Sequence, residues 1–586
     1  MFLYGVRSRF NLVLGVIAAL CVVAGGYYLH VLTTGERLWG YAALPVLTGA
    51  WGLVLAIRQN PRRLRLLGLA TAAGVSLGLG FGPLPAWPLQ ALGFAALLYL
   101  TDELTRRGLG VWQQWWYGYH ALLVYNVVAT WWVVNTAFAA GFVANYLNAL
   151  LMAVPWVLTF LVRRHMPKVW VVAAIALWIG FEYLHYNWQI AWPWLTLGNA
   201  LASTPDLAQW YSLTGVFGGS LYLAGAGALT YRVAARRREG QTTQRAGLAV
   251  VAWLALPAIA SYLMLPGEAA YADAPLARVA AVQPNYEPHY AKFSVPDREQ
   301  VTRLDSLVAA APGADLYVLP ETSFGGVDQD RLAQNGSLRL LSRDARDLLV
   351  GVSAHRRFGG DTGDPALRTR PDGRGGSVYY VVYNSAVAVD AGAPGAVYNK
   401  VKRVPGVEFL PYRRLLFFFE PLVASLGGTT AGLGVNDSAE VFRYARSGVR
   451  VAPLICYESV YGDYVREFTR AGANLLAVPT NDGWWDDTPG HVQHLNLARL
   501  RAIENRRYVV QAANSGVSAV VDARGRVLAQ TGYDEIAVLS GDVRLLDGET
   551  LYVRYGDQVG RLAAGASCLL LLSLVAQRWR RGAGIA

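Results

Sequence analysis

Ten apolar stretches, each about as long as a membrane-spanning helix, restrict what this 586-residue chain can fold into. Nine precede Pro266, at about residues 10–29, 38–57, 64–82, 84–100, 115–134, 138–162, 168–188, 210–231 and 246–264, and the tenth lies at about 562–576. About 20 apolar residues suffice to cross a bilayer as a helix. Hydrophobic residues make up 54% of the chain and charged ones only 16%, so we predict a polytopic membrane protein.

Basic residues fall in every second loop between these stretches. They are Arg7 and Arg9; Arg58, Arg62, Arg63 and Arg65; Arg106 and Arg107; Arg163, Arg164 and Lys168; Arg232, Arg236, Arg237 and Arg238; and Arg578, Arg580 and Arg581. Because such loops stay on the cytoplasmic side, both termini are expected in the cytoplasm and the segment from about Pro266 to Gly560 outside. The net charge of +12 thus reflects topology, and without a basic stripe we expect no nucleic-acid partner.

These patterns predict three parts: a transmembrane helical domain over residues 1–265, a globular domain over 266–560, and a C-terminal transmembrane helix with a basic tail over 561–586. The globular part alternates short β-branched runs with amphipathic stretches, which is typical of an α/β domain. Strands are expected at 278–283, 316–320, 348–354, 378–389, 449–455, 475–479, 508–512 and 517–522, and helices at 298–310, 461–471 and 491–505. The aromatic, glycine-rich stretch 408–438 lacks a clear period and is expected to dip into lipid.

Cys456 ends the apolar, strand-length run 451–455 and precedes an amphipathic stretch. Enzymes of the α/β class present a nucleophile at such a strand-to-helix elbow. Cys21 and Cys568 lie in apolar stretches, so Cys456 has no disulfide partner in its own domain. A lone thiol is more often a small buried hydrophobe, so a nucleophile also requires a base and an oxyanion partner.

Glu321 is the candidate base because it directly follows the apolar run 316–320. If the strands are parallel, it lies at the same sheet edge as Cys456. A carboxylate in a largely apolar pocket has a raised proton affinity and can take a thiol proton near neutral pH. A helix N-cap or a surface carboxylate is the alternative.

Lys400 is the candidate cation. A fixed ammonium favours the thiolate and, together with the backbone N–H of Tyr457, stabilises an oxyanion. Most single lysines are merely solvated, and Lys402 competes for the role.

Other polar patterns are weaker. Glu182 and His185, three apart in an apolar stretch, indicate a polar cavity or a helix-to-helix hydrogen bond, and we favour the latter. His491 and His494 share a helix face, but no further ligand cluster accompanies them, so we expect no metal. The run Gly351-Val352-Ser353-Ala354-His355 lacks the glycine of a serine elbow, and no phosphate-binding loop is found.

Glu321, Lys400 and Cys456, in this order, resemble the Glu-Lys-Cys triad of the nitrilase superfamily. The surrounding sequence is similar to the apolipoprotein N-acyltransferase family at Leu319-Pro320-Glu321-Thr322, Tyr383-Asn384-Ser385, Tyr398-Asn399-Lys400, Cys456-Tyr457-Glu458, Thr480-Asn481-Asp482-Gly483-Trp484-Trp485, and the run from Gln493 through Arg501 and Glu504 to Val517. The position of the family's lysine before Val-Pro selects Lys400 over Lys402.

The resemblance implies a polytopic α-helical membrane domain plus an extracytoplasmic, nitrilase-like α/β domain built as an αββα sandwich. It also implies ping-pong acyl transfer in a bacterial inner membrane, with the catalytic domain on the periplasmic side. A phospholipid would donate its acyl chain to Cys456, and the α-amino group of an S-diacylglyceryl-cysteine at a lipoprotein N-terminus would accept it. No metal or cofactor is implied.

The resemblance assigns roles to residues as well. Glu321 acts as base and then acid, while Lys400 and the Tyr457 amide hold the oxyanion. The implied lining of the substrate site comprises Asn384, Glu408, Tyr457, Glu458 and Trp484, with Glu408 assisting Lys400.

The sequence departs from the family pattern at three places. Val404-Pro405-Gly406-Val407-Glu408 displaces a glycine and removes an aromatic residue, Phe293 replaces a common tryptophan, and the first two apolar stretches are additional. The triad alone does not choose between water and an amine as acceptor. A membrane-tethered nitrilase-type amidase therefore remains an alternative, as does a transporter or lipid-binding protein whose globular domain has lost its chemistry.

Overall fold

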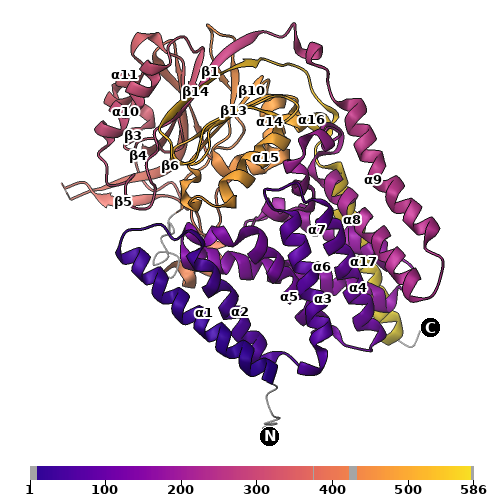
Figure 1. The fold of residues 1–586 in the computed structure, drawn as a ribbon. Coiled ribbons are helices and arrows are strands. Elements are labelled where there is room, and N and C mark those ends of the chain that lie inside the picture. The colour runs from indigo at the N-terminus through magenta and orange to yellow at the C-terminus, as the bar shows by residue number, and fades with distance from the viewer. Residues whose placement is uncertain (1–8, 374, 422–431, 583–586) are drawn as a thin grey trace.

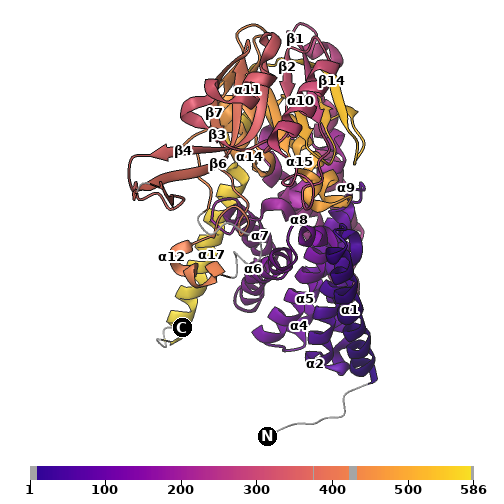
Figure 2. The same cartoon turned by 90° about the vertical axis from the view of Figure 1, so that its left-hand side faces the viewer.

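A computed structural model describes residues 9–373, 375–421 and 432–582. Long helices form a bundle below two β-sheets (Figure 1). In this view α1 (Arg9–Thr34) begins and α17 (Gln558–Gly582) ends at the end of the bundle away from the sheets. Figure 2 shows α17 running from the sheets back along the bundle.

The bundle helices coincide with the ten predicted apolar stretches. Besides α1 and α17 they are α2 (Leu44–Arg58), α3 (Leu64–Gly80), α4 (Pro88–Arg106), α5 (Val111–Thr130), α6 (Phe138–His165), α7 (Trp170–Tyr186), α8 (Tyr211–Arg238) and α9 (Gln244–Met264). Within the described ranges, six helices are long and apolar enough to cross a membrane, namely α1, α2 with its leading turn, α6, α8, α9 and α17, and α3 and α7 are shorter apolar helices. These helices indicate a multi-pass membrane protein.

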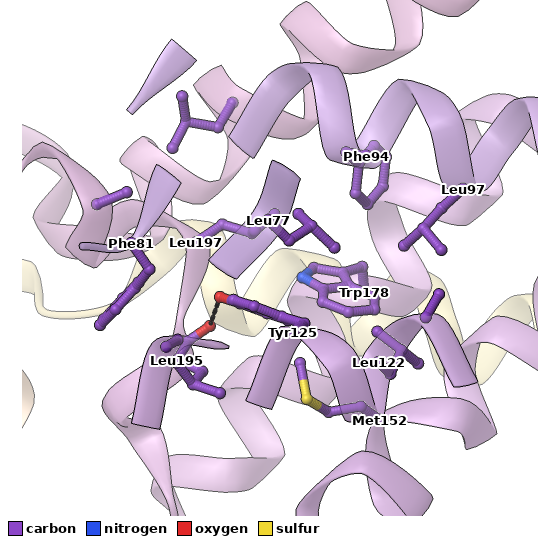
Figure 3. Close-up of a cluster of buried hydrophobic side chains, with 14 of the residues drawn as sticks. Leu77, Phe81, Phe94, Leu97, Leu122, Tyr125, Met152, Trp178, Leu195 and Leu197 are labelled. Atoms are coloured by element: carbon purple, nitrogen blue, oxygen red, sulfur yellow. Dashed lines mark hydrogen bonds between the residues drawn. The ribbon is translucent and has the colours of Figure 1, made fainter. Parts of the chain in front are cut away.

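Large side chains fill the centre of the bundle (Figure 3). Trp178 of α7 lies edge-on to Phe94 of α4, with ring centroids 5.9 Å apart. The hydroxyl of Tyr125 on α5 donates a 3.0 Å hydrogen bond to the carbonyl of Leu195. All these side chains are buried, so they fix the segment that leaves α7 toward the sheets.

His185 makes the helix-to-helix hydrogen bond that we favoured, whereas Glu182 bonds within α7 and to the segment that follows it. Oε1 of Glu182 accepts from the indole N–H of Trp178 at 2.9 Å and from the backbone N–H of Leu197 at 2.8 Å. Nε2 of His185 lies 2.7 Å from Oδ1 of Asn148 on α6. The pair therefore ties α7 to its neighbours, as buried polar groups require.

Three arginines converge on Asp102 near the end of α4. Arg106 lies on the same helix, Arg163 on α6 and Arg238 on α8, and all three form salt bridges with the Asp102 carboxylate, whose side chain is only 1% exposed. They come from three of the predicted basic loops. These loops therefore meet on one face of the bundle, as the charge alternation requires.

Two sheets lie above the bundle (Figure 1). The first has the order β14-β1-β2-β4-β6-β5, with β3 paired to β4 and β7 to β6. Its strands are β1 (Leu276–Gln283), β2 (Leu316–Val318), β3 (Val327–Asp328), β4 (Leu348–Phe358), β5 (Arg368–Pro371), β6 (Ser377–Asp390), β7 (Ala393–Asn399) and β14 (Ala537–Arg544). The second has the order β13-β12-β11-β10-β9-β8. Its strands are β8 (Phe442–Arg443), β9 (Arg450–Pro453), β10 (Leu475–Thr480), β11 (Tyr508–Ala513), β12 (Ala519–Val521) and β13 (Val527–Gln530).

The sheets pack face to face between two helix layers. Val279 and Leu316 of the first sheet share one buried apolar cluster with Val451 and Val509 of the second. Helices α10 (Asp297–Ala310) and α11 (Gly336–Leu341) cover the first sheet, while α14 (Gly462–Arg470) and α15 (Pro489–Asn505) cover the second. This arrangement confirms the predicted αββα sandwich.

Helix α15 is buried between the second sheet and the bundle. Ala498 and Ala502 pack on the sheet, whereas Leu497, Leu500 and Ile503 belong to the core of the bundle. An apolar surface on both sides is expected of a helix enclosed by two layers.

Polar contacts also join the sheets to the bundle. The side chain of Gln493 on α15 accepts from the indole of Trp194 at 2.8 Å and donates to the carbonyl of Ala129 at 3.0 Å. At the tip of the additional α1–α2 hairpin, the backbone N–H of Gly40 donates to Asp486 at 2.9 Å. Both parts of the chain thus form one continuous body.

The predicted strands coincide with β1, β2, β4, β6, β9, β10, β11 and β12, and the predicted helices with α10, α14 and α15. The remaining strands were missed because they are short or lie on exposed edges. Within the stretch 408–438, residues 422–431 fall outside the described residues. The preceding part forms α12 (Arg413–Leu416) and exposes Leu415, Phe417 and Phe418, and its insertion into lipid remains a prediction.

We predict that Asp102→Asn lowers the free energy of unfolding by about 2 kcal/mol, because a neutral amide cannot replace charge-assisted hydrogen bonds to the arginines. Thermal unfolding of the detergent-solubilised chain measures this. Asp273→Asn, at an exposed acid, is the control and should leave the midpoint unchanged. Equal midpoints for both variants would contradict a structural role for the arginine cluster.

Candidate active site

A buried charged cluster lies at one end of the first sheet. Nζ of Lys400 is 3.2 Å from Oε1 of Glu321 and 2.9 Å from Oε1 of Glu408, and its side chain is 2% exposed. The amide of Asn384 donates to Glu321 at 2.7 Å and to Glu408 at 3.3 Å. Four residues predicted for the site are therefore in direct contact.

Local backbone geometry sets these side chains in place. Glu321 follows β2, and the chain there passes so close to Gly351 of β4 that a Cβ on Gly351 would lie 2.3 Å from the carbonyl oxygen of Pro320. Only glycine permits this approach. Lys400 directly follows β7, and its backbone N–H donates to the carbonyl of Asn384 on the neighbouring β6 at 2.9 Å.

Cys456 comes from the second sheet. It follows β9 and opens the short helix η11 (Cys456–Val460). Its φ of 51° lies in the left-handed region that residues with a side chain rarely adopt. Such local strain is typical of a nucleophile elbow, and it agrees with the predicted strand-to-helix turn.

The expectation that Glu321 and Cys456 share one edge of a single sheet is wrong. Strands β1, β2 and β4 are parallel in the first sheet, and β9, β10 and β11 are parallel in the second. Because the sheets pack face to face, the site forms between them. Both Glu321 and Lys400 interact electrostatically with the Cys456 thiol across this interface.

Burial raises the pKa of the Cys456 thiol well above its usual value, and the Glu321 carboxylate raises it further, while the Lys400 ammonium lowers it only in part. The resting group is therefore a thiol. Burial by itself would lower the pKa of Lys400, but the carboxylates of Glu321 and Glu408 hold it well above the usual value. Lys400 remains an ammonium.

The raised proton affinity expected of Glu321 is also wrong. Burial opposes its charge, yet the Lys400 ammonium and the Asn384 amide outweigh burial and hold the pKa of Glu321 below its usual value. The pocket is shielded from water but contains a cation and a hydrogen-bond donor, which the strand pattern alone did not show.

Helix α15 holds both ends of η11. Nε2 of His494 lies 3.2 Å from the carbonyl oxygen of Cys456 and 2.9 Å from Oγ of Ser459, and its Nδ1 lies 2.9 Å from Oδ1 of Asp482. Two turns further along α15, Arg501 donates to the carbonyl of Val460 at 2.9 Å.

This role of His494 was not predicted, because the sequence indicated only that His494 shares a helix face with His491. Burial opposes its protonation, but Asp482 raises its pKa above the usual value. The sequence signal that could have indicated this role is the spacing of seven residues between His494 and Arg501, which places both on one face of a helix.

Glu458 lies behind the reactive residues. Its carboxylate accepts from the Tyr398 hydroxyl at 2.6 Å and from the backbone N–H groups of Val401 at 2.7 Å and Ile455 at 2.9 Å. Burial raises the pKa of Glu458 to about 7. Glu458 thus clamps the chain after Lys400 to the turn that carries Cys456.

Tyr457 and Trp484 point to different surroundings. The buried Tyr457 donates to the carbonyl of Ala191 at 3.2 Å and stacks on Trp192, both in the segment that follows α7. Trp484 stacks on Phe293, with ring centroids 6.0 Å apart. Tyr457 therefore connects the nucleophile turn to the bundle, while Trp484 contacts the residue that replaces the family's tryptophan.

The displaced glycine of the Val404–Glu408 segment does not separate Glu408 from Lys400. Gly406 adopts a positive φ of 80°, which glycine accepts at no steric cost. The turn brings Oε2 of Glu408 within 2.7 Å of the Val404 backbone N–H, while Oε1 faces Lys400.

Lys292 is a further buried cation that sequence analysis did not place in the site. Its ammonium donates to the carbonyl of Glu321 at 3.1 Å and to the hydroxyl of Thr322 at 3.0 Å. Burial lowers the pKa of Lys292 to about 8. It positions the backbone of Glu321, and no local sequence pattern distinguishes it from a solvated lysine.

A cavity of about 760 Å³ is lined by residues that directly follow Lys400 in the chain. One wall comes from the end of α7 and the residues after it, including Tyr186, Trp188 and Ala191, and the other from the segment 401–415 that follows Lys400. Its position at the junction with the bundle suits a ligand that reaches the site from the membrane.

The chain matches two family profiles. The carbon-nitrogen hydrolase profile matches residues 278–551, which contain both sheets, and the profile of the apolipoprotein N-acyltransferase N-terminal domain matches residues 73–229 of the bundle.

Relatives match over nearly their whole length. The apolipoprotein N-acyltransferase of Azotobacter vinelandii is 31% identical over 539 residues, covering 88% of this chain and 96% of the relative. That of Chlorobaculum tepidum is 28% identical over 528 residues, covering 87% and 97%. Among solved structures, an amidase from Nesterenkonia sp. is 21% identical, with 48% of this chain and 92% of that chain covered and a TM-score of 0.31. This chain belongs to the apolipoprotein N-acyltransferase family.

Proposed function

We propose that this chain transfers an acyl chain from a phospholipid to the α-amino group of an N-terminal S-diacylglyceryl-cysteine of a lipoprotein, through a thioester on Cys456. The observation that carries the proposal is the meeting of Cys456, Glu321 and Lys400 between the two sheets, beside a cavity at the junction with the bundle. The names of the relatives, which match both the bundle and the sheets, support it.

In the first half-reaction, Sγ of Cys456 attacks the ester carbonyl as Glu321 takes the thiol proton. A C–S bond forms, and the carbonyl oxygen becomes an oxyanion that Lys400 and the Tyr457 backbone N–H stabilise. Collapse breaks the ester C–O bond. The leaving oxygen takes the proton from Glu321 and departs as lysophospholipid.

In the second half-reaction, the neutral amine attacks the thioester carbonyl and Glu321 takes a proton from the nitrogen. A C–N bond forms and the C–S bond breaks. The Cys456 sulfur then recovers its proton from Glu321, which returns the enzyme to its starting state.

The charge balance of the cluster supports these roles. In the resting state the Lys400 ammonium is paired with the carboxylates of Glu321 and Glu408. When Glu321 is protonated, the negative charge moves to sulfur and then to the oxyanion. Lys400 can stabilise the displaced charge without first being desolvated, because it is already buried. Glu408 keeps Lys400 protonated and oriented throughout.

The proposed location is a bacterial inner membrane, with the sheets on the periplasmic side. The salt-bridged arginines near Asp102 and the ends of α1 and α17 support this assignment, because basic loops favour the cytoplasmic face. Both proposed substrates carry lipid chains, so a site at the junction of bundle and sheets suits them.

We predict that incubation with phospholipid alone adds an acyl group to Cys456, seen as a mass increase on the peptide containing this residue. Cys456→Ala should abolish the adduct, whereas Cys21→Ala and Cys568→Ala should retain it. A diacylglyceryl peptide added next should become N-acylated. Release of free fatty acid without peptide acylation would favour the amidase-type hydrolase, and an unreactive Cys456 would favour a lipid-binding protein without chemistry.

The pKa shifts predict the pH dependence of adduct formation. Glu321 is a carboxylate above its depressed pKa and Cys456 stays a thiol below its raised pKa, so titration of these two groups should not change the wild-type rate between about pH 6 and 8, and protonation of the base should slow the reaction only in stronger acid. In Glu321→Gln the rate should be lower and rise about tenfold per pH unit, because hydroxide must ionise the thiol. A flat profile for that variant would argue against Glu321 as the base.

We predict that Asp482→Asn slows acylation of Cys456 by about tenfold or more, because the His494 ring loses the charged partner that orients it toward the Cys456 carbonyl. Because Glu321 remains in place as the base, this variant should not show the tenfold rise per pH unit that is expected of Glu321→Gln. Asp487→Asn, at an exposed acid on the same segment, is the matched control. Equal rates for the two variants would refute the positioning role.

A further inference from the structure

The cavity beside the site is lined by an excess of positive charge. Lys402, Arg403, Arg413 and Arg414 all line it, and the described residues that line it include no aspartate or glutamate. Apolar side chains complete the wall, among them Trp188 at the end of α7 and Leu410 and Leu415 from the opposite segment.

Two of these cations are held by aromatic rings and backbone groups. The Lys402 ammonium lies 5.1 Å from the ring centroid of Tyr461 and 5.5 Å from that of Tyr464. The Arg403 guanidinium lies 4.5 Å from the ring of Phe409 and donates to the carbonyl of Leu433. Such contacts orient a cation without neutralising it.

The carboxylates near the cavity either bond to groups outside its wall or pair with only one of its cations. Arg413 forms a 2.6 Å salt bridge with Glu420. Glu408 and Asp364 act on Arg403 only at a distance, and Glu408 is bonded to Lys400. Over the described ranges, neither Arg403 nor Arg414 has a salt bridge to a carboxylate.

The cavity is connected to the catalytic residues through the chain. Val401 and Lys402 in its wall directly follow Lys400, and Ala191 in the opposite wall accepts the hydrogen bond of Tyr457. If a headgroup binds here, the ester bonds of the same lipid can extend toward Cys456. The apolar side chains of the wall lie next to the bundle.

We propose that this cavity binds the headgroup phosphate of the acyl donor and selects phospholipids of net negative charge over zwitterionic ones. Arginine and lysine side chains are the usual partners of a phosphodiester. The ammonium of a zwitterionic headgroup would meet further cations here and no carboxylate in the lining, which disfavours it. This inference rests on the proposed function, because it names the donor class of the same reaction.

The test compares phosphatidylglycerol with phosphatidylethanolamine of identical acyl chains, presented to the full chain in neutral detergent. The measured quantity is kcat/KM for thioester formation on Cys456, followed by intact mass. We expect phosphatidylglycerol to be preferred by about tenfold, and Arg414→Gln to reduce that preference severalfold. Arg414 is exposed, so the variant should fold. Arg339→Gln, at an exposed arginine on α11, is the matched control and should retain the preference.

A second arm separates a lipid headgroup from free phosphate as the ligand. Glycerophosphoglycerol, the headgroup diester without acyl chains, should compete with the donor, whereas inorganic phosphate at the same concentration should not. Equal competition by inorganic phosphate would overturn assignment to a lipid headgroup. Equal rates with both phospholipids would overturn the selectivity while leaving the proposed acyl transfer intact, whereas absence of a thioester with either lipid would instead refute the proposed function.

Discussion

The buried ammonium of Lys400 between two carboxylates is the interaction on which the site depends. An unpaired ammonium cannot be kept charged away from water, and neither can an unpaired carboxylate. Lys400, Glu321 and Glu408 therefore stabilise one another's charged forms, and the Asn384 amide donates to the same Oε1 atoms of both carboxylates that the ammonium contacts. The Cys456 thiol stays neutral at rest, so its proton is transferred to Glu321 only when the sulfur attacks.

This cluster requires both sheets. The carboxylate and the ammonium come from the first sheet, and the sulfur comes from the second, so none of the chemistry exists until the two faces have packed. Glu458 links the halves, because its carboxylate accepts hydrogen bonds from the chain after Lys400 and from the turn before Cys456. The left-handed backbone at Cys456 is maintained by the same contacts, together with those of His494 and Arg501.

Hydropathy located the bundle helices because each helix that crosses a bilayer must by itself be long enough and apolar enough to do so. Strands such as β10 and β11 were equally visible, since they are buried on both faces and read as continuous apolar runs. Cys456 and Glu321 were candidates because each follows an apolar run of strand length, and similarity to a family then joined them into a triad and selected Lys400 over Lys402. Their assembly across two sheets, the depressed pKa of Glu321 and the contacts of Lys292 and His494 were not predicted, because they depend on which residues meet in space rather than on neighbours in the chain.

Helix α15 presents alanines to a sheet and leucines to the bundle, and its Gln493 bonds to both Trp194 and Ala129. The globular half is thus not a water-soluble enzyme tethered to an anchor. If the globular half were separated from the bundle, the apolar side of α15, the helix that supports the nucleophile turn, would be exposed to water and prone to aggregation. The folded bundle is in this sense a structural requirement of the catalyst, because it covers the helix that holds the nucleophile turn.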